Sequence, residues 1–170
     1  LYRKRLQEMA YAAAKTEERL DAAPTLTEWT LQHRFIGGHR FSFDGHEYLR
    51  EVYDYFSGFE PDKHVVIEKG AQLGASELAI SCSFWFADVC SPCRIIYFFP
   101  TDTDVADFSR DRISQAIDGS PYLRDIVATG LGKRDVDNIH LKTIRRSLIY
   151  FRGMFAKRRT KSVPADMVIF

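Results

Sequence analysis

Residues 64–86 read HVVIEKGAQLGASELAISCSFWF, and this stretch decides the fold that the sequence predicts. The short apolar run from His64 to Glu68 has the composition of a strand. The run from Lys69 to Ser76 contains two glycines and leads into a segment that favours a helix. A strand, a glycine-containing turn and a helix N-terminus direct several backbone N–H groups and the positive end of a helix dipole at one place. We therefore predict a phosphate-binding loop over residues 69–76.

This loop departs from the common pattern G-x-x-x-x-G-K-[ST] at two positions. Gly74 and Ser76 match the second glycine and the hydroxyl residue, whereas Lys69 stands at the first glycine and Ala75 at the lysine. The four-carbon stem of Lys69 is long enough to fold over the loop and reach the same phosphate oxygens. Ser76 is the expected Mg²⁺ ligand, because Mg²⁺ combines a few protein oxygens with phosphate and water. A strand-to-helix turn that binds no nucleotide is the alternative interpretation.

Length and composition fit one globular domain. The chain has 170 residues, and 45% of them are hydrophobic, which suits a sizeable core. The sequence shows neither an apolar run of about 18 residues nor a secretory leader. We therefore expect a cytoplasmic protein without a membrane span.

The cysteines are expected to be structural. Cys82, Cys90 and Cys93 lie too close together for a disulfide framework, and their odd number leaves one unpaired. Reduced thiols fit an intracellular setting. Cys90 and Cys93 form a C-x-x-C pair, but no second pair stands at metal-ligand spacing, and the two residues link a helix end to a strand start. Buried cysteines are favoured over a redox pair or a zinc site.

The net charge of +1 conceals an uneven distribution. Residues 133–161 carry ten of the 24 lysines and arginines and only two acidic residues, whereas the preceding part of the chain is net acidic. The densest basic run contains Lys157, Arg158, Arg159 and Lys161. Such runs often contact nucleic-acid phosphates, so we predict DNA binding here. A solvated surface loop is the alternative.

The rest of the sequence predicts alternating helices and strands. Helices are expected over residues 1–22, 47–53, 75–90 and 102–118, and strands over residues 64–68, 94–99, 139–142, 147–151 and 166–170. The helix at 75–90 is apolar on nearly all sides and must be covered by a sheet. The run at 94–99 is continuously apolar, as in the interior of parallel sheets. This order argues for an α/β sandwich over residues 24–170, preceded by an amphipathic helix over residues 1–23.

Four segments together resemble one known family, the lambda-type large subunit of tailed-phage terminases. They are EYLREVYD at 47–54, EKGAQLGASE at 68–77, IYFFPTDTD with FSRDR within 96–112, and KSVPADMVIF at 161–170. Their order and spacing match as well, over roughly residues 40 to 170. The resemblance implies a P-loop NTPase-like fold of the ASCE or RecA-like type, with a mostly parallel sheet sandwiched by helices.

The resemblance implies an ATP-driven motor that pushes double-stranded DNA into a preformed capsid. A metal-dependent nuclease that cuts the DNA is expected in a C-terminal part of the full-length protein. In the family an Asp-Glu pair, the Walker B acids, directly follows the strand that resembles residues 167–170. We therefore expect the chain to be truncated just before these acids and to lack ATP hydrolysis on its own. The implied partners are the small terminase subunit, the portal and procapsid, and further copies in a homo-oligomeric ring, in the cytoplasm of the infected bacterial host.

The resemblance also implies which residues bind ATP and Mg²⁺. The expected nucleotide contacts are Lys69, Gly70, Ala71, Gln72, Leu73, Gly74, Ala75, Ser76 and Glu77. Lys69 and Gln72 are the catalytic candidates: some members carry their cation at the position of Lys69, and several place an arginine at the position of Gln72. Ser76 is expected to bind Mg²⁺. From the aromatic-rich region 41–56 we predict that Tyr48 packs against adenine, with a place in the core as the alternative.

Two other classes of function stay open. The chain could be a DNA- or protein-binding module with a vestigial nucleotide loop, which Ala75 and the amphipathic first helix favour. It could also be another P-loop enzyme, such as a nucleotide kinase, although such enzymes normally keep the G-K-[ST] lysine.

Overall fold

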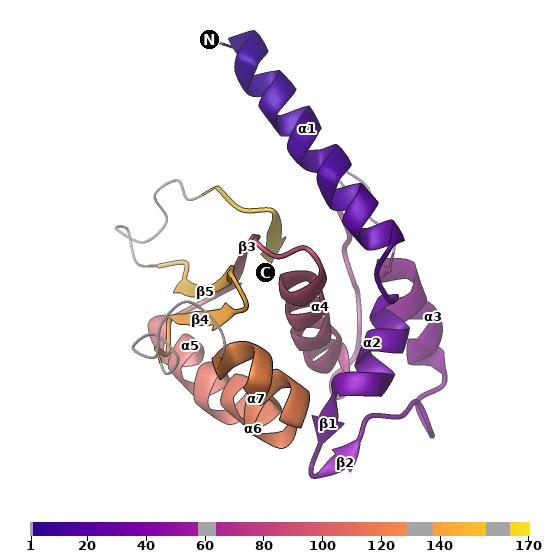
Figure 1. The fold of residues 1–170 in the computed structure, drawn as a ribbon. Helices are drawn as coiled ribbons and strands as arrows, with labels where there is room; N and C mark the ends of the chain where they lie inside the picture. The colour runs from indigo at the N-terminus through magenta and orange to yellow at the C-terminus, as the bar shows by residue number, and fades with distance from the viewer. Residues whose placement is uncertain (1, 58–63, 129–137, 156–163) are drawn as a thin grey trace.

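The computed structural model describes residues 2–57, 64–128, 138–155 and 164–170, and Figure 1 shows the arrangement of its elements. The helices are α1 (Tyr2–Asp21), α2 (Leu26–His33), α3 (Tyr48–Phe56), α4 (Ala75–Val89), α5 (Asp102–Phe108), α6 (Gln115–Gly119) and α7 (Pro121–Ala128), with the π-helical segment η1 (Ser109–Ser114) between α5 and α6. The strands are β1 (Phe35–Ile36), β2 (His39–Arg40), β3 (Arg94–Phe99), β4 (Leu141–Ile144), β5 (Ser147–Gly153) and β6 (Met167–Ile169).

Four strands form the main sheet in the order β4-β5-β3-β6. The apolar strand β3 runs parallel to both of its neighbours, with Ile95 opposite Ile149 on β5 and Met167 on β6. β4 pairs antiparallel with β5 through a tight turn, where Arg145 adopts a φ of 50°. This mixed α/β architecture with a mostly parallel sheet agrees with the sequence prediction.

Helices α4 and α5 pack against the same face of this sheet. Side chains alternate along β5, and Ser147 and Phe151 point to its buried face. The Ser147 hydroxyl donates to the carbonyl of Ala87 on α4 (2.7 Å), and the ring centroids of Phe151 and Phe108 lie 6.4 Å apart. We predicted helices on both faces, but these two share one face, and residues 148, 150 and 152 on the opposite face of β5 stay half-buried. An apolar strand pattern does not reveal which face each helix covers.

Helix α4 is buried because it is apolar around most of its circumference. Ile80, Phe84 and Ala87 have no exposed surface. The sheet lies on one side of α4, and α2 contacts it from another, as Figure 1 shows. Only four residues separate the end of α4 from the start of β3, so the N-terminus of α4 lies toward the carboxyl ends of the parallel strands. Open α/β sheets bind their ligands at that edge.

Residues 64–68 do not form the predicted strand. They have no regular secondary structure, and the Val66 side chain is 93% exposed. A strand needs a partner for its backbone hydrogen bonds, and no described strand pairs with residues 64–68. The prediction was wrong because an apolar composition does not supply that partner.

Two helices were not predicted, although each has a start signal. At the start of α2, the Thr25 hydroxyl accepts from the Glu28 N–H (3.2 Å), and the Glu28 carboxylate accepts from the Thr25 N–H (2.9 Å). This is a capping box, readable as T-x-x-E. α7 begins with Pro121 after Ser120, whose hydroxyl accepts from the Leu123 N–H (3.2 Å).

The other predicted elements are present with small shifts of their ends. The predicted strand 94–99 matches β3, and the two strands around residues 145 and 146 are the hairpin β4–β5. α1 confirms the first helix and projects from the body of the molecule (Figure 1). The predicted helix 102–118 is present, but it contains η1 in its middle.

Candidate functional site

The loop before α4 has two residues in left-handed backbone conformations. Gln72 has a φ of 58° and Gly74 a φ of 77°. A non-glycine residue in this region is uncommon and is often found at ligand-binding turns. Gly74 is the N-cap of α4, and a Cβ atom there would lie 2.8 Å from Cδ1 of Leu49. Glycine also offers no side chain to cap the first N–H groups of α4, which suits an anion as their partner.

The predicted phosphate and metal contacts come together at this helix end. Lys69 is exposed, and its ammonium group donates to the carbonyl of Gly70 (3.2 Å), so the side chain lies along the loop. Ser76 is exposed on the first turn of α4. Ser76 thus lies in the first turn of α4, and Lys69 and Gln72 lie in the loop that leads into it. Their contacts with nucleotide and metal stay predictions.

Tyr48 precedes the loop by 21 residues in the chain, and its neighbour Leu49 packs against the loop. It is the first residue of α3, and the next residue, Leu49, is the one that approaches Gly74. The Tyr48 side chain is 50% exposed, and its ring centroid lies 6.1 Å from that of His46. Tyr48 is therefore not a core residue, which was the alternative, and its contact with adenine stays a prediction.

A charged cluster of Arg34, Glu77 and Arg112 adjoins the loop and was not predicted as a unit. Glu77 directly follows Ser76 in the first turn of α4. Its Oε2 accepts a hydrogen bond from Nη2 of Arg34 (2.5 Å), and its Oε1 accepts one from Nη1 of Arg112 (3.3 Å). The Arg34 side chain is 1% exposed, whereas that of Arg112 is 56% exposed.

Arg34 is held by further contacts inside the protein. Its Nε donates to the Ser81 hydroxyl (3.3 Å), and its guanidinium lies 5.8 Å from the centroid of the Phe84 ring. Burial lowers the pKa of Arg34, and attraction to Glu77 opposes that shift. The two arginines stand 43 and 35 residues from Glu77, so no local pattern reveals the cluster.

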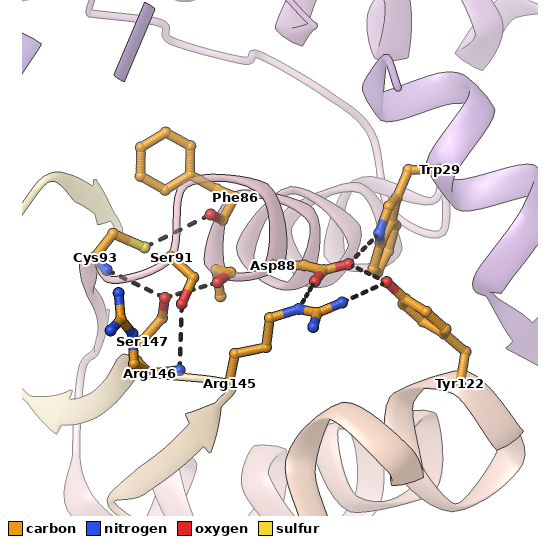
Figure 2. A network of polar contacts seen from close by, with 10 residues as sticks. Trp29, Phe86, Asp88, Ser91, Cys93, Tyr122, Arg145, Arg146 and Ser147 are labelled. Atoms are coloured by element: carbon orange, nitrogen blue, oxygen red, sulfur yellow. Dashed lines mark hydrogen bonds and ion pairs between the residues drawn. The ribbon is translucent and has the colours of Figure 1, made fainter. Parts of the chain in front are cut away.

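The opposite end of α4 is fixed by Asp88, as Figure 2 shows. Its Oδ2 accepts hydrogen bonds from Nε1 of Trp29 (2.9 Å) and from the hydroxyl of Tyr122 (2.7 Å), and its Oδ1 accepts one from Nε of Arg145. Nη2 of Arg145 also donates to the Tyr122 hydroxyl (3.1 Å). This network joins α2, α4, α7 and the β4–β5 turn. It positions α4 at the end remote from the loop.

The cysteines agree with the predicted structural role. Cys90 and Cys93 are buried and not bonded to each other. Burial raises the pKa of Cys90 to about 12 and that of Cys93 to about 11, so both are protonated thiols at neutral pH. Within the described ranges, no group of three or more His, Cys, Asp or Glu side chains is arranged to hold a metal ion.

Two further predictions concern DNA and the membrane. The predicted DNA contacts, Lys157, Arg158, Arg159 and Lys161, lie outside the residues that the structure describes. In the part of the chain that is described, every helix is too short or too polar to cross a membrane.

Comparison with known families supports the resemblance seen in the sequence. A sequence model of the family described as "Phage terminase large subunit gpA, ATPase domain" matches residues 39–170. No curated protein and no solved structure matches the chain. The matched range contains the loop, Glu77 and Arg112, and it leaves out α1 and α2. Because the match covers most of its length, this chain belongs to the family of phage terminase large subunits, within their ATPase domain.

Proposed function

We propose that this chain is the nucleotide-binding part of an ATP-driven motor that moves double-stranded DNA into a phage capsid. The observation that carries the proposal is the family match over residues 39–170, which includes the whole loop. A large terminase subunit with an ATPase domain has a role in DNA packaging. Our proposal adds the nucleotide-binding site, the movement of DNA and, in the full-length protein, the cutting of DNA.

The residues at the head of α4 fit a bound ATP. The helix N-terminus has a glycine cap at a φ of 77°, and Lys69 and Ser76 are exposed beside it. An anion at this place would receive N–H groups and the positive end of the helix dipole. Ser76 presents a hard hydroxyl oxygen, which suits Mg²⁺ together with phosphate and water.

Phosphoryl transfer requires mainly positioning and charge neutralisation from the protein. Bound ATP with Mg²⁺ supplies the phosphoryl group and the free energy of its hydrolysis. We assign to Lys69 the neutralisation of phosphate charge, and to residues 70–76 the orientation of the phosphates by backbone N–H groups. Gln72 carries no charge, so its amide can donate a hydrogen bond to a phosphate oxygen without neutralising it.

The remaining expectations from the family are part of the same proposal. The basic run at 157–161 would contact the DNA backbone, and the small terminase subunit, the portal and procapsid, and further copies in a ring would be the protein partners. A metal-dependent nuclease in the full-length protein would cut the DNA. The place of action would be the cytoplasm of the infected bacterium.

Titration of the chain with ATP and Mg²⁺ tests the nucleotide site. We expect saturable binding that Lys69→Ala weakens by about tenfold or more, because a charged donor to phosphate is among the strongest hydrogen bonds. Lys15→Ala is the matched control, since it removes an exposed lysine from α1. It should bind as the wild type does. Absence of binding by the wild type would reject the nucleotide site, and unchanged binding by Lys69→Ala would reject the role of Lys69.

A further inference from the structure

We propose that Arg112 is a second phosphate-contacting cation of this site, held beside the loop by Glu77 until nucleotide binds. The inference rests on the proposed nucleotide site. The common loop carries its lysine where this chain has Ala75, and here Lys69 stands at the entrance of the loop instead, so the first turn of α4 has no lysine or arginine of its own. Arg112 lies where it can supply that charge.

The geometry of Glu77 brings Arg112 to the head of α4. Nη1 of Arg112 lies 3.3 Å from Oε1 of Glu77, and Glu77 follows Ser76 directly. Glu77 lies in the first turn of α4, so its carboxylate is within one side-chain length of the N–H groups of that turn. Phosphates on the first-turn N–H groups of α4 would therefore lie within reach of the long side chain of Arg112.

The negative charge of Glu77 is already balanced by Arg34, without Arg112. Arg34 already holds Oε2 at 2.5 Å from a position that is almost fully buried. With Arg112 the cluster carries two positive charges and one negative charge. A bare carboxylate at this place would repel phosphates, whereas this cluster has a net charge of +1 and would attract them.

The hold of Glu77 on Arg112 is weak enough to be exchanged. The Arg112 side chain is 56% exposed, and exposed ion pairs contribute little to stability. A phosphate that carries more charge than a carboxylate, at a helix N-terminus, is the stronger partner. Arg112 can thus turn from Glu77 to the nucleotide without loss of the fold.

The backbone that carries Arg112 is unusual. Arg112 belongs to η1, the π-helical segment within the long helix that runs from α5 to α6. Inside η1, the Ser114 hydroxyl donates to the carbonyl of Ser109 (3.0 Å). π-Helical turns are rare and occur often at functional sites, because they change the direction of side chains relative to an α-helix. Here Ile113 is fully buried while Arg112 reaches Glu77.

The test compares the binding of ATP with Mg²⁺ by the full chain and by variants of two neighbouring arginines. Arg112→Ala should weaken binding by about tenfold or more, and Arg112→Lys should retain part of the affinity. Arg110→Ala is the matched control, because it removes an exposed positive charge two residues away on the same helix. It should bind as the wild type does, and thermal unfolding of all three variants should stay close to that of the wild type.

Glu77→Gln distinguishes a phosphate contact from an effect through Glu77. If Arg112 contacts the phosphate itself, adding Arg112→Ala to Glu77→Gln lowers ATP affinity by a further factor of about ten, because that contact does not depend on Glu77. Equal losses in Arg112→Ala and Glu77→Gln, with no further loss in the double variant, would overturn the proposal. If Glu77→Gln does not fold, because it leaves the buried charge of Arg34 unpaired, the comparison of Arg112→Ala with Arg110→Ala decides.

The outcomes separate this inference from the function on which it rests. Binding by the wild type that Arg112→Ala leaves unchanged would overturn the inference alone. No binding by the wild type would overturn the nucleotide site and this inference with it.

Discussion

At the scale of single residues, Gly74 is constrained both by its backbone and by its neighbour. Its φ of 77° lies in the left-handed region, and a Cβ atom would meet Cδ1 of Leu49 at 2.8 Å. The Cδ1 methyl group is the end of the Leu49 side chain and can move aside, so the backbone conformation of Gly74 is the stronger constraint. Gly74 therefore sets the direction in which the loop enters α4.

Gly74→Ala should weaken both the fold and nucleotide binding. Placing alanine in a left-handed conformation costs about 1–2 kcal/mol, and a shifted loop would misplace the N–H groups offered to phosphate. Gly45→Ala is a matched control, because Gly45 has a φ of 74° with nothing within 4 Å of the added Cβ. Urea unfolding should show similar losses of stability in both variants, whereas ATP affinity should fall only in Gly74→Ala. Wild-type affinity in Gly74→Ala would contradict this role of the loop.

At the scale of elements, α4 is held at both ends by acidic side chains that accept hydrogen bonds from other elements. Glu77 links its first turn to Arg34, the C-cap residue of α2, and to η1, and Asp88 links its last turn to α2, α7 and the β4–β5 turn. The ring of His33 on α2 stacks on that of Tyr122 on α7, with centroids 3.7 Å apart. The helix that carries the loop is therefore a fixed support, and it is the loop that is exposed.

The contact between α2 and α7 should make stability depend on pH. Burial lowers the pKa of His33, and attraction to Asp88 opposes this shift. The unfolded chain then takes up this proton at a higher pH than the folded chain, so acid favours unfolding. The free energy of unfolding should fall as the pH drops below the ordinary histidine pKa of about 6.5 and through the lowered pKa of the folded state. His33→Phe, which keeps a ring on Tyr122, should reduce this slope in urea unfolding, and an unchanged slope would contradict the assignment.

The elements that could be predicted are those with a signal inside their own sequence. β3 is a continuous apolar run and α4 is apolar on nearly all sides, so both were predicted almost to the residue. The strand at 64–68 was wrong because strand formation depends on a partner elsewhere in the chain. α2 and α7 have recognisable start signals, but each is only eight residues long, too short for a clear helical repeat of apolar residues.

The candidate site was predictable in part for the same reason. The loop and its glycine, lysine and serine follow a local pattern, and the structure places Gly74 and Ser76 at the start of α4, with Lys69 in the preceding loop. Arg34 and Arg112 reach Glu77 from distant parts of the chain, so only the fold brings them there. Their importance for the net charge at the loop could not be derived from spacing.

At the scale of the whole molecule, charge separates two regions of the chain. The part before residue 133 is net acidic, and residues 133–161 are strongly basic. A packaging motor must accept any DNA sequence, and contacts with phosphates carry no base information. We therefore propose that the basic run holds DNA without selecting its sequence.

Replacing the basic run should reduce the salt dependence of DNA binding. Each lost phosphate contact makes the slope of log affinity against log salt shallower by about 0.9. A variant with four alanine substitutions should therefore have a slope shallower by roughly 3 to 4. The variant replaces Lys157, Arg158, Arg159 and Lys161. Filter binding at several salt concentrations measures the slope, and sequence preference should stay unchanged.

A second fourfold variant controls for the loss of charge alone. It removes exposed basic residues outside this run, Lys4, Lys15, Arg110 and Arg124. Its slope should stay near that of the wild type. A basic-run variant whose slope changes no more than that of the control would remove residues 157–161 from the DNA contact.

Hydrogen exchange with and without nucleotide tests most directly whether the head of α4 binds phosphate. Backbone N–H groups that donate to phosphate exchange more slowly, so ATP with Mg²⁺ should protect the amides of residues 70–77 in the full chain. Adenosine, which has no phosphate, should leave these amides unprotected at the same concentration. The predicted result is that ATP with Mg²⁺ protects residues 70–77 and adenosine does not. Saturating ATP that leaves these amides as fast as in the free protein, or protects them no more than adenosine does, would contradict the nucleotide site.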